Sequence, residues 1–149
     1  MSEKLGQDLV REDLSVATDF RRFKAFLLDE MIVAVVVIAA LWEPLTLVQD
    51  TITQIEIINA NIFFIILFRI VYQTVFIAYY GATLGKMWQR IFVIDTEGFE
   101  KPTLLKSLVR ASMRVVSNLC FGYGFLWAYS SPFRQTWHDK VAKTIVINA

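Results

Sequence analysis

The apolar residues of this chain are concentrated in two long runs with a short acidic loop between them. The first run covers Phe20–Trp42 and is unbroken from Met31 onward, and the second covers Ile57–Tyr80. At about 1.5 Å per residue, each is long enough to cross a hydrocarbon core of roughly 30 Å. The pattern therefore predicts two full transmembrane helices, the first ending at Trp42-Glu43-Pro44 because proline stops a helix.

A third helical segment is basic. Within residues 103–118, Lys106, Arg110 and Arg114 recur at every fourth position, and apolar residues occupy the other faces. This arrangement is typical of an amphipathic helix that lies in the membrane interface or lines a bundle.

The aromatic stretch 121–129 that follows is too short to cross a membrane separately. If residues 104–131 crossed once, Arg134 and the lysines after it would lie outside, against the positive-inside rule. We therefore expect a re-entrant or hairpin arrangement that bends near Gly122, with a single crossing as the alternative.

Two short runs, Arg90–Asp95 and Thr144–Ile147, are rich in β-branched and aromatic residues. Pairing them would form a small cytosolic β element beneath the helices. The predicted fold is thus an all-α integral membrane protein with two full spans, a basic third segment and this β cap. Residues 1–19 are expected to form a cytosolic arm, mobile or lying on the surface, with a helix that docks a partner as the alternative. Residues 20–149 are expected to form the membrane domain.

The loop from Glu43 to Glu56 contains no Lys or Arg, whereas basic residues flank every other segment. The positive-inside rule then predicts that this loop lies outside and that both termini are cytosolic.

Composition agrees with a membrane protein, since 56% of the residues are apolar and the mean hydropathy is +0.49. A net charge of +1 gives no cation excess for binding nucleic acid. The single Cys120 excludes an internal disulfide and a cysteine-cluster metal site. We expect no cofactor and no bound metal.

Charged residues inside the apolar runs are the main candidates for function. Asp29 shares a helix face with Arg22 and Ala25, whereas Glu30 points about 100° away. Asp29 should therefore face protein or water, and we expect it to pair with Arg69 near the middle of the second run. A carboxylate that exchanges a proton for a cation is the functional hypothesis, with Glu30 as a secondary candidate. A permanent ion pair that never titrates is the alternative.

The His138-Asp139-Lys140 run supplies too few ligands for zinc, and no motif brings a nucleophile beside it. Enzymatic activity is therefore not expected. Asp139 should cap a turn or helix and bind Arg22, Arg110 or Arg114, and His138 is a secondary candidate. The Gly81–Lys86 run lacks the spacing of a nucleotide-binding P-loop.

The motifs follow in a definite order: Arg22-x-x-Ala25-x-x-x-Asp29, Gly81-x-Thr83-x-Gly85-Lys86, Val93-x-Asp95-x-x-Gly98, Arg110, and Arg134-Gln135-Thr136-x-His138-Asp139-Lys140-x-Ala142-x-Thr144-x-Val146. In this order and spacing the chain resembles the RDD family of membrane proteins over residues 20–147. The resemblance implies that Arg22, Asp29 and Asp139 are the family's named residues. It also implies transport of ions or small solutes, including cation/proton antiport.

We therefore expect a multi-pass protein of the bacterial inner membrane that contacts the lipid bilayer and transports an ion or small solute as a homo-oligomer. The candidate charge network is Arg22, Asp29, Arg69, Arg110, Arg114 and Asp139. The rival interpretation is a non-transporting subunit that holds or assembles a larger membrane complex. The oligomeric state in mild detergent would distinguish the two.

Overall fold

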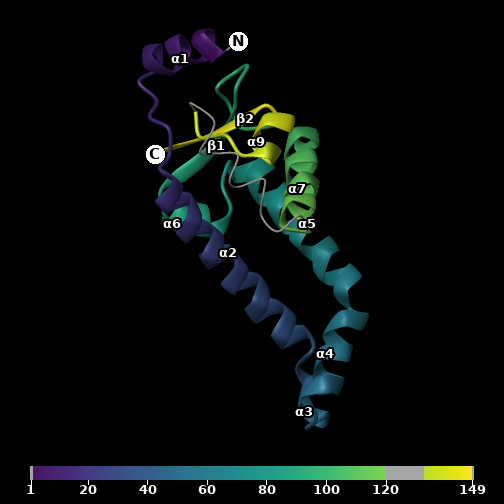
Figure 1. Ribbon diagram of the computed structural model, residues 1–149. Helices are drawn as coiled ribbons and strands as arrows, with labels where there is room; N and C mark the ends of the chain where they lie inside the picture. The colour runs from purple at the N-terminus through teal and green to yellow at the C-terminus, as the bar shows by residue number, and fades with distance from the viewer. Residues whose placement is uncertain (1, 120–132, 149) are drawn as a thin grey trace.

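A computed structural model describes residues 2–119 and 133–148. The protein is mostly helical and has two parts, a long helical arm and a head that contains a small sheet (Figure 1). The elements in chain order are α1 Ser2–Arg11, α2 Asp19–Ala40, α3 Trp42–Leu47, α4 Thr51–Ala60, α5 Ile62–Tyr80, α6 Leu84–Trp88, β1 Ile91–Asp95, α7 Leu104–Leu119, α9 Trp137–Val141 and β2 Thr144–Asn148.

The first predicted span corresponds to α2, which ends at Ala40 before the predicted stop. The chain turns at Leu41 and continues as α3. Pro44 is the third residue of α3, where a missing N–H breaks no helical hydrogen bond. The prediction that Pro44 ends the first helix was therefore wrong.

The second predicted span is divided between α4 and α5. The break lies at Asn61, whose side-chain amide donates to the carbonyl of Ile57 at 2.8 Å. Among the described residues, α5 is the one helix long and apolar enough to cross a membrane. The structure thus contains one candidate span where the sequence predicted two full ones.

The predicted β element is confirmed. β1 and β2 pair antiparallel, with Ile91 opposite Asn148 and Asp95 opposite Thr144. Side chains from both strands are buried. They form the apolar core of the head together with residues of α1, α2, α5 and the segment between α1 and α2: Leu9, Ala17, Ala25, Ile77, Ile91, Val93, Ile94, Ile145, Val146 and Ile147.

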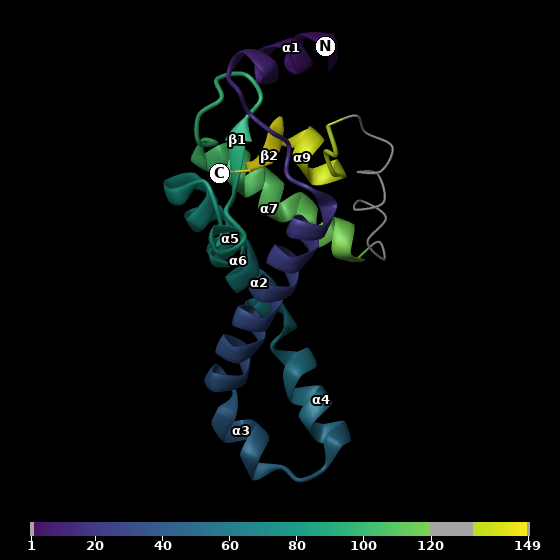
Figure 2. The ribbon, with the colours of Figure 1, turned by 90° about the vertical axis from the view of Figure 1, so that its left-hand side faces the viewer.

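Residues 1–19 were expected to be a mobile or surface-lying arm. They contain helix α1, which lies against the sheet end of the head, as two perpendicular views show (Figures 1 and 2). Leu9 is buried against Ile94 and Ile145. Val16 forms a β-bridge with Ile147, and the Ala17 N–H donates to the carbonyl of Val146. This segment is therefore packed into the head rather than free of it.

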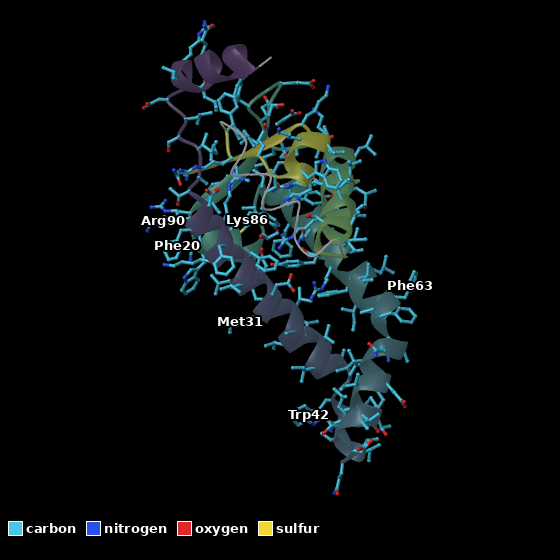
Figure 3. All side chains as sticks on the ribbon, in the orientation of Figure 1. Phe20, Met31, Trp42, Phe63, Lys86 and Arg90 are labelled. Atoms are coloured by element: carbon cyan, nitrogen blue, oxygen red, sulfur yellow. The ribbon has the colours of Figure 1, made fainter. Side chains whose placement is uncertain are left out.

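The arm exposes apolar side chains. In α2 the buried residues are Ala25, Asp29 and Val33, whereas Met31 is 64% exposed. In α5 the buried residues all follow Val71, and Phe63 is 67% exposed. Figure 3 shows Met31, Trp42 and Phe63 on the outside of the arm. Such a surface suits a hydrocarbon solvent, because it would be unfavourable in water.

Helix α7 has the reverse arrangement of a helix in a water-soluble protein. Its buried positions include Ser107, Arg110, Arg114 and Ser117, whereas Leu105 is 70% exposed. These positions are spaced i, i+3, i+7 and i+10, so one polar face turns into the protein. The predicted basic helix is confirmed. The predicted bend near Gly122 lies outside the described residues.

Candidate functional site

The Asp29 carboxylate is 2% exposed and is surrounded by donors from three segments. Oδ1 accepts from the Tyr72 hydroxyl at 3.0 Å and from the Gly85 N–H at 2.9 Å. Oδ2 accepts from the Thr83 hydroxyl at 2.7 Å, and Lys86 Nζ lies 3.9 Å away. The prediction that Asp29 faces protein is confirmed.

The approach of α6 to α2 requires glycine at position 85. A Cβ built there would lie 2.3 Å from the carbonyl oxygen of Ala25 and 2.8 Å from Asp29 Oδ1. Real Cβ atoms do not approach oxygen so closely, so any side chain would push the two helices apart. Gly85 thus brings a backbone N–H into contact with the carboxylate.

The predicted pair between Asp29 and Arg69 was wrong. Arg69 instead binds Glu30, with Nη2–Oε2 at 2.6 Å and Nη1–Oε1 at 3.3 Å. Helices α2 and α5 run in opposite directions (Figure 1). Arg69 of α5 therefore contacts Glu30 of α2, and Tyr72, about one turn later in α5, contacts Asp29, which precedes Glu30 in α2. Both partners of the Glu30–Arg69 pair are partly exposed, at 27% and 34% of their side chains.

A second buried carboxylate, Asp139, lies in the head at the start of α9. Its Oδ1 pairs with Arg110 Nη2 at 2.6 Å, and its Oδ2 pairs with Arg22 Nη1 at 3.2 Å. Asp139 also accepts from the Thr136 N–H at 3.2 Å, and the two residues form a capping box. The predictions that Asp139 caps a helix and binds Arg22 or Arg110 are confirmed, whereas no contact joins it to Arg114 among the described residues.

Arg22 joins this cluster to the sheet. Its Nη1 donates to the Arg134 carbonyl at 2.6 Å, and its Nη2 donates to the Val146 carbonyl at 3.2 Å. The guanidinium thus holds the start of α2 against the chain on both sides of α9.

The structure holds His138 neutral and Asp139 ionised. Burial lowers the pKa of His138 to about 3, although Asp139 opposes the shift, so the imidazole is neutral near pH 7. Burial alone would raise the pKa of the Asp139 carboxyl, but Arg110 and the other nearby cations outweigh it and lower that pKa. His138 Nε2 lies 2.9 Å from the Thr136 hydroxyl.

The charges of Asp29 and Asp139 both act on Arg114, but among the described residues no ion pair joins it to either carboxylate. Its Nη1 and Nε lie 2.6 and 3.3 Å from the amide oxygen of Gln73 once that amide is oriented to accept. Its guanidinium also lies 5.1 Å from the centre of the Phe26 ring, which is a cation–π distance.

Lys86, in α6, is the lysine of the Asp29 cluster. Burial lowers the pKa of Lys86 to about 7, and the charge of Arg114 adds to that shift, although Asp29 opposes it. Lys86 can therefore lose its proton near neutral pH, whereas the arginines keep their charge.

The structure brings the predicted candidates into two adjoining clusters. One cluster surrounds Asp29. The other consists of Arg22, Arg110, His138 and Asp139. Four residues of the Asp29 cluster were missing from the predicted site: Tyr72, Thr83, Gly85 and Lys86. The signal that points to three of them is the Thr83-x-Gly85-Lys86 run, which was noted only as a family motif.

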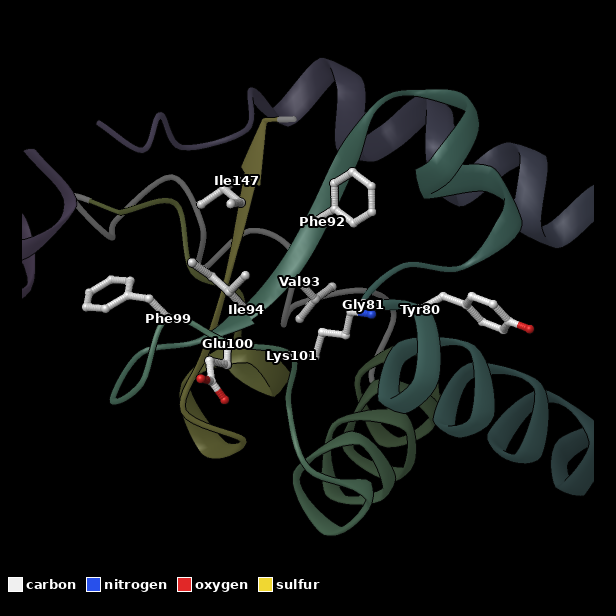
Figure 4. Close-up of a pocket in the computed structure, with 9 residues that line it drawn as sticks. All are labelled: Tyr80, Gly81, Phe92, Val93, Ile94, Phe99, Glu100, Lys101 and Ile147. Carbon is white, nitrogen blue, oxygen red and sulfur yellow. The ribbon is translucent and has the colours of Figure 1, made fainter. Parts of the chain in front are cut away.

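A separate open cavity of about 660 Å³ lies against the sheet, away from both clusters. Figure 4 shows its lining, with Phe92 and Ile94 of β1 beside Tyr80 and Lys101. The Lys101 ammonium donates to the carbonyl of Tyr79 at 3.2 Å. The described residues contain no cluster of three or more His, Cys, Asp or Glu side chains that could hold a metal ion.

Comparison with known proteins gives a family and one relative. A sequence profile of the RDD family matches residues 16–143. An uncharacterised protein of Rickettsia prowazekii is 33% identical over 78 residues, which is 52% of this chain and 43% of that protein. The match thus spans less than half of the relative's own length. No solved structure matches the chain.

Proposed function

Because the chain belongs to the RDD family, which is a family of membrane proteins, we propose that α2 and the α4–α5 arm both cross a bilayer. The exposed apolar side chains of both helices support this arrangement, as does the length of α5. In α2 all charged residues precede Met31, and the stretch from Met31 to Ala40 is apolar.

The proposed orientation has both termini in the cytosol of a bacterium and residues 43–56 outside its inner membrane. The β-bridge between Val16 and Ile147 supports it, because it requires the two ends of the chain to be on the same side. The absence of Lys and Arg from residues 43–56 favours the outer side for the loop. Labelling of single cysteines in a Cys120→Ser background tests this: external labelling at Asn148 would contradict it.

For the activity, we propose transport of an ion or small charged solute, without an enzymatic step. The observation that carries this proposal is the set of buried ionic groups shared by α2, α6, α7 and α9. The set comprises Arg22, Asp29, Lys86, Arg110, Arg114 and Asp139. Burying charged groups costs free energy, and apolar residues at these positions would be sufficient for folding alone.

Cation/proton exchange is one form of this activity, and the contact between Asp29 and Lys86 favours it. If a cation bound Asp29, Lys86 would lose its counter-ion, and its low pKa would favour release of a proton. In this form Asp29 binds the cation and Lys86 carries the proton.

The test uses pure protein in lipid vesicles, with a pH-sensitive dye inside and an imposed gradient of Na⁺, K⁺ or an anion. We expect Asp29→Asn to abolish ion-driven proton movement and Glu30→Gln to retain most of it, because Glu30 is paired at the partly exposed side of α2. Equal losses in the two variants would remove Asp29 from the mechanism.

A homo-oligomer is part of the proposal, because two spans rarely enclose a pathway alone. Its alternative is a non-transporting subunit that assembles a larger membrane complex. Wild-type vesicles without flux, together with a monomer that co-purifies with a large partner in mild detergent, would favour that alternative.

A further inference from the structure

The buried ionic groups of the head are not balanced in charge. Lys86, Arg110 and Arg114 are each at most 7% exposed, and the side chain of Arg22 is 13% exposed. The carboxylates among them are Asp29 and Asp139. Four cations therefore face two carboxylates, while the adjoining Glu30–Arg69 pair is neutral by itself.

These groups are close enough to act on one another. The charges of Arg114, Asp29, Arg110 and Asp139 all contribute to the pKa of Lys86. Residues 120–132, CFGYGFLWAYSSP, contain no Asp or Glu to compensate the excess. An excess of buried positive charge is costly unless a negative group accompanies it.

Several hydrogen-bond donors of α7 are also without acceptors. Arg110 Nη1, Arg114 Nη2 and the hydroxyls of Ser107 and Ser117 have no hydrogen-bond partner within the described part of the chain. All four residues belong to the buried face of α7. A buried donor without an acceptor has given up its hydrogen bonds to water and gained none in return, so this face lacks a group that accepts several hydrogen bonds.

We propose that the buried face of α7 binds a phosphate-type oxyanion, either free in solution or as the headgroup of a phospholipid. This inference rests on the proposed transport function, since it names the ligand class of the same site. Free phosphate carries about −1.5 to −2 charges near pH 7. The phosphodiester of a lipid headgroup carries a single negative charge, and both groups accept hydrogen bonds through several oxygens. Either group therefore matches the surplus of positive charge, which is two when Lys86 is protonated and one when Lys86 is neutral. It also matches the unpaired guanidinium donors, which bind such groups well.

Arg114→Gln is the decisive variant. Removing Arg114 leaves no carboxylate without its partner, because the described contacts of its guanidinium are to Gln73 and Phe26. Arg90→Gln is the matched control, because Arg90 is exposed and outside the cluster. Arg114→Lys keeps the positive charge but loses the planar guanidinium group with its paired donors. It serves as a second variant if Arg114→Gln fails to fold.

The measurement is the melting temperature of delipidated protein in detergent, titrated with inorganic phosphate or sulfate against chloride at constant pH and ionic strength. We expect phosphate to raise the melting temperature by several degrees in the wild type and in Arg90→Gln, with a smaller rise in Arg114→Lys and none in Arg114→Gln.

The same variants in nanodiscs distinguish the two sources of the phosphate group. For a lipid headgroup, phosphatidylglycerol added to phosphatidylcholine should stabilise the wild type, and native mass spectrometry should find phospholipid bound to it and not to Arg114→Gln. If neither free phosphate nor phosphatidylglycerol separates the wild type from Arg114→Gln, the proposal is overturned.

Failure of this inference is distinguishable from failure of the proposed function. Anion binding without any flux in vesicles would overturn transport and leave the anion site in place. Cation-driven flux that is unaffected by phosphate, in a protein that phosphate does not stabilise, would overturn the anion site and leave transport in place.

Discussion

Asp29 and Asp139 are both fully buried carboxylates, but different kinds of partner hold them. Asp139 pairs with the guanidinium groups of Arg22 and Arg110. Asp29 accepts hydrogen bonds from two hydroxyls and a backbone N–H, and its nearest described cation is Lys86 at 3.9 Å. Arginine keeps its charge, whereas a buried lysine can lose its proton. The Asp139 cluster is therefore permanently ionic, and the Asp29 cluster can change its charge.

The largest effect should follow Asp139→Asn, because this substitution leaves both Arg22 and Arg110 buried without a counter-ion. Breaking a buried pair costs about 3–5 kcal/mol, and here two pairs break together. We expect little folded protein in a thermal melt in detergent. Asp19→Asn is the control, since its contact with Arg134 is 3.8 Å long and partly exposed; an equal loss in the control would contradict the ionic role of Asp139.

Gly85→Ala tests whether the Asp29 cluster depends on close contact between α6 and α2. The added methyl would overlap the Ala25 carbonyl, so we expect a loss of about 1–3 kcal/mol, the usual cost of overpacking. Gly98→Ala is the matched control, because a Cβ at Gly98 meets nothing within 4 Å. Equal melting temperatures for the two variants would mean that α6 does not approach α2 as described.

Asp29→Asn should cost less stability than Asp139→Asn, about 1–2 kcal/mol. The asparagine side chain retains an oxygen that accepts a hydrogen bond from Tyr72 or Thr83. Lys86 loses its negatively charged partner, but it can become neutral by releasing a proton. The two variants are compared in the same thermal melts. If Asp29→Asn proved the more damaging, the Asp29 cluster would be the rigid one and the comparison would be reversed.

The Glu30–Arg69 pair should give a smaller effect, because both side chains are partly exposed. In a double-mutant cycle of Glu30→Gln and Arg69→Gln, we expect a coupling of about 0.5–1 kcal/mol. The Asp29→Asn and Arg69→Gln pair should be additive within error. Coupling in the second cycle and none in the first would restore the pair predicted from the sequence.

A pH dependence of stability, to which each cluster contributes one titrating group, provides the last prediction. His138 has a folded pKa of about 3 against an ordinary 6.5, so its contribution to stability is lost as pH falls below about 6.5. From pH 7.5 to 6 we expect a loss of about 1 kcal/mol from His138. Lys86, whose pKa of about 7 is below its ordinary 10.5, adds a loss of the same sign.

The His138→Gln variant should lose the part of the pH dependence that is due to His138 and keep the part that is due to Lys86. The groups that act on the imidazole are Thr136, Asp139, Arg110, Arg114 and Lys86. Melting temperatures of wild type and variant at the two pH values provide the measurement, and parallel pH profiles would exclude His138 as the cause.

The sequence predicted the parts of this molecule whose signals are local or periodic. Basic residues at every fourth position predicted α7, and two short β-type runs predicted the sheet. Apolar composition also led to the membrane class. The expected cap at Asp139 has a local basis, because Asp139 lies three residues beyond Thr136, which is the spacing of the capping box seen in the structure.

The contacts of Asp29 were not predictable in the same way. They depend on α6, a five-residue helix too short to show a period, folding back against α2. The predicted partner was chosen by depth along two straight helices, and depth does not fix rotation. The face of α5 that meets Asp29 carries Tyr72, and Arg69 is rotated towards Glu30.

The bridge between Val16 and Ile147 has a consequence for the order in which the protein forms. The chain is synthesised from the N-terminus, so Arg22 and Arg110 leave the ribosome well before Asp139 and the β2 strand that complete their surroundings. Contacts so distant in sequence form slowly. The long helices can thus enter the membrane early, while the head closes only after the last strand has been made. During that interval Arg22 and Arg110 lack their carboxylate and β1 lacks its partner strand, so chaperones or proteases that recognise the nascent protein would meet an unclosed head.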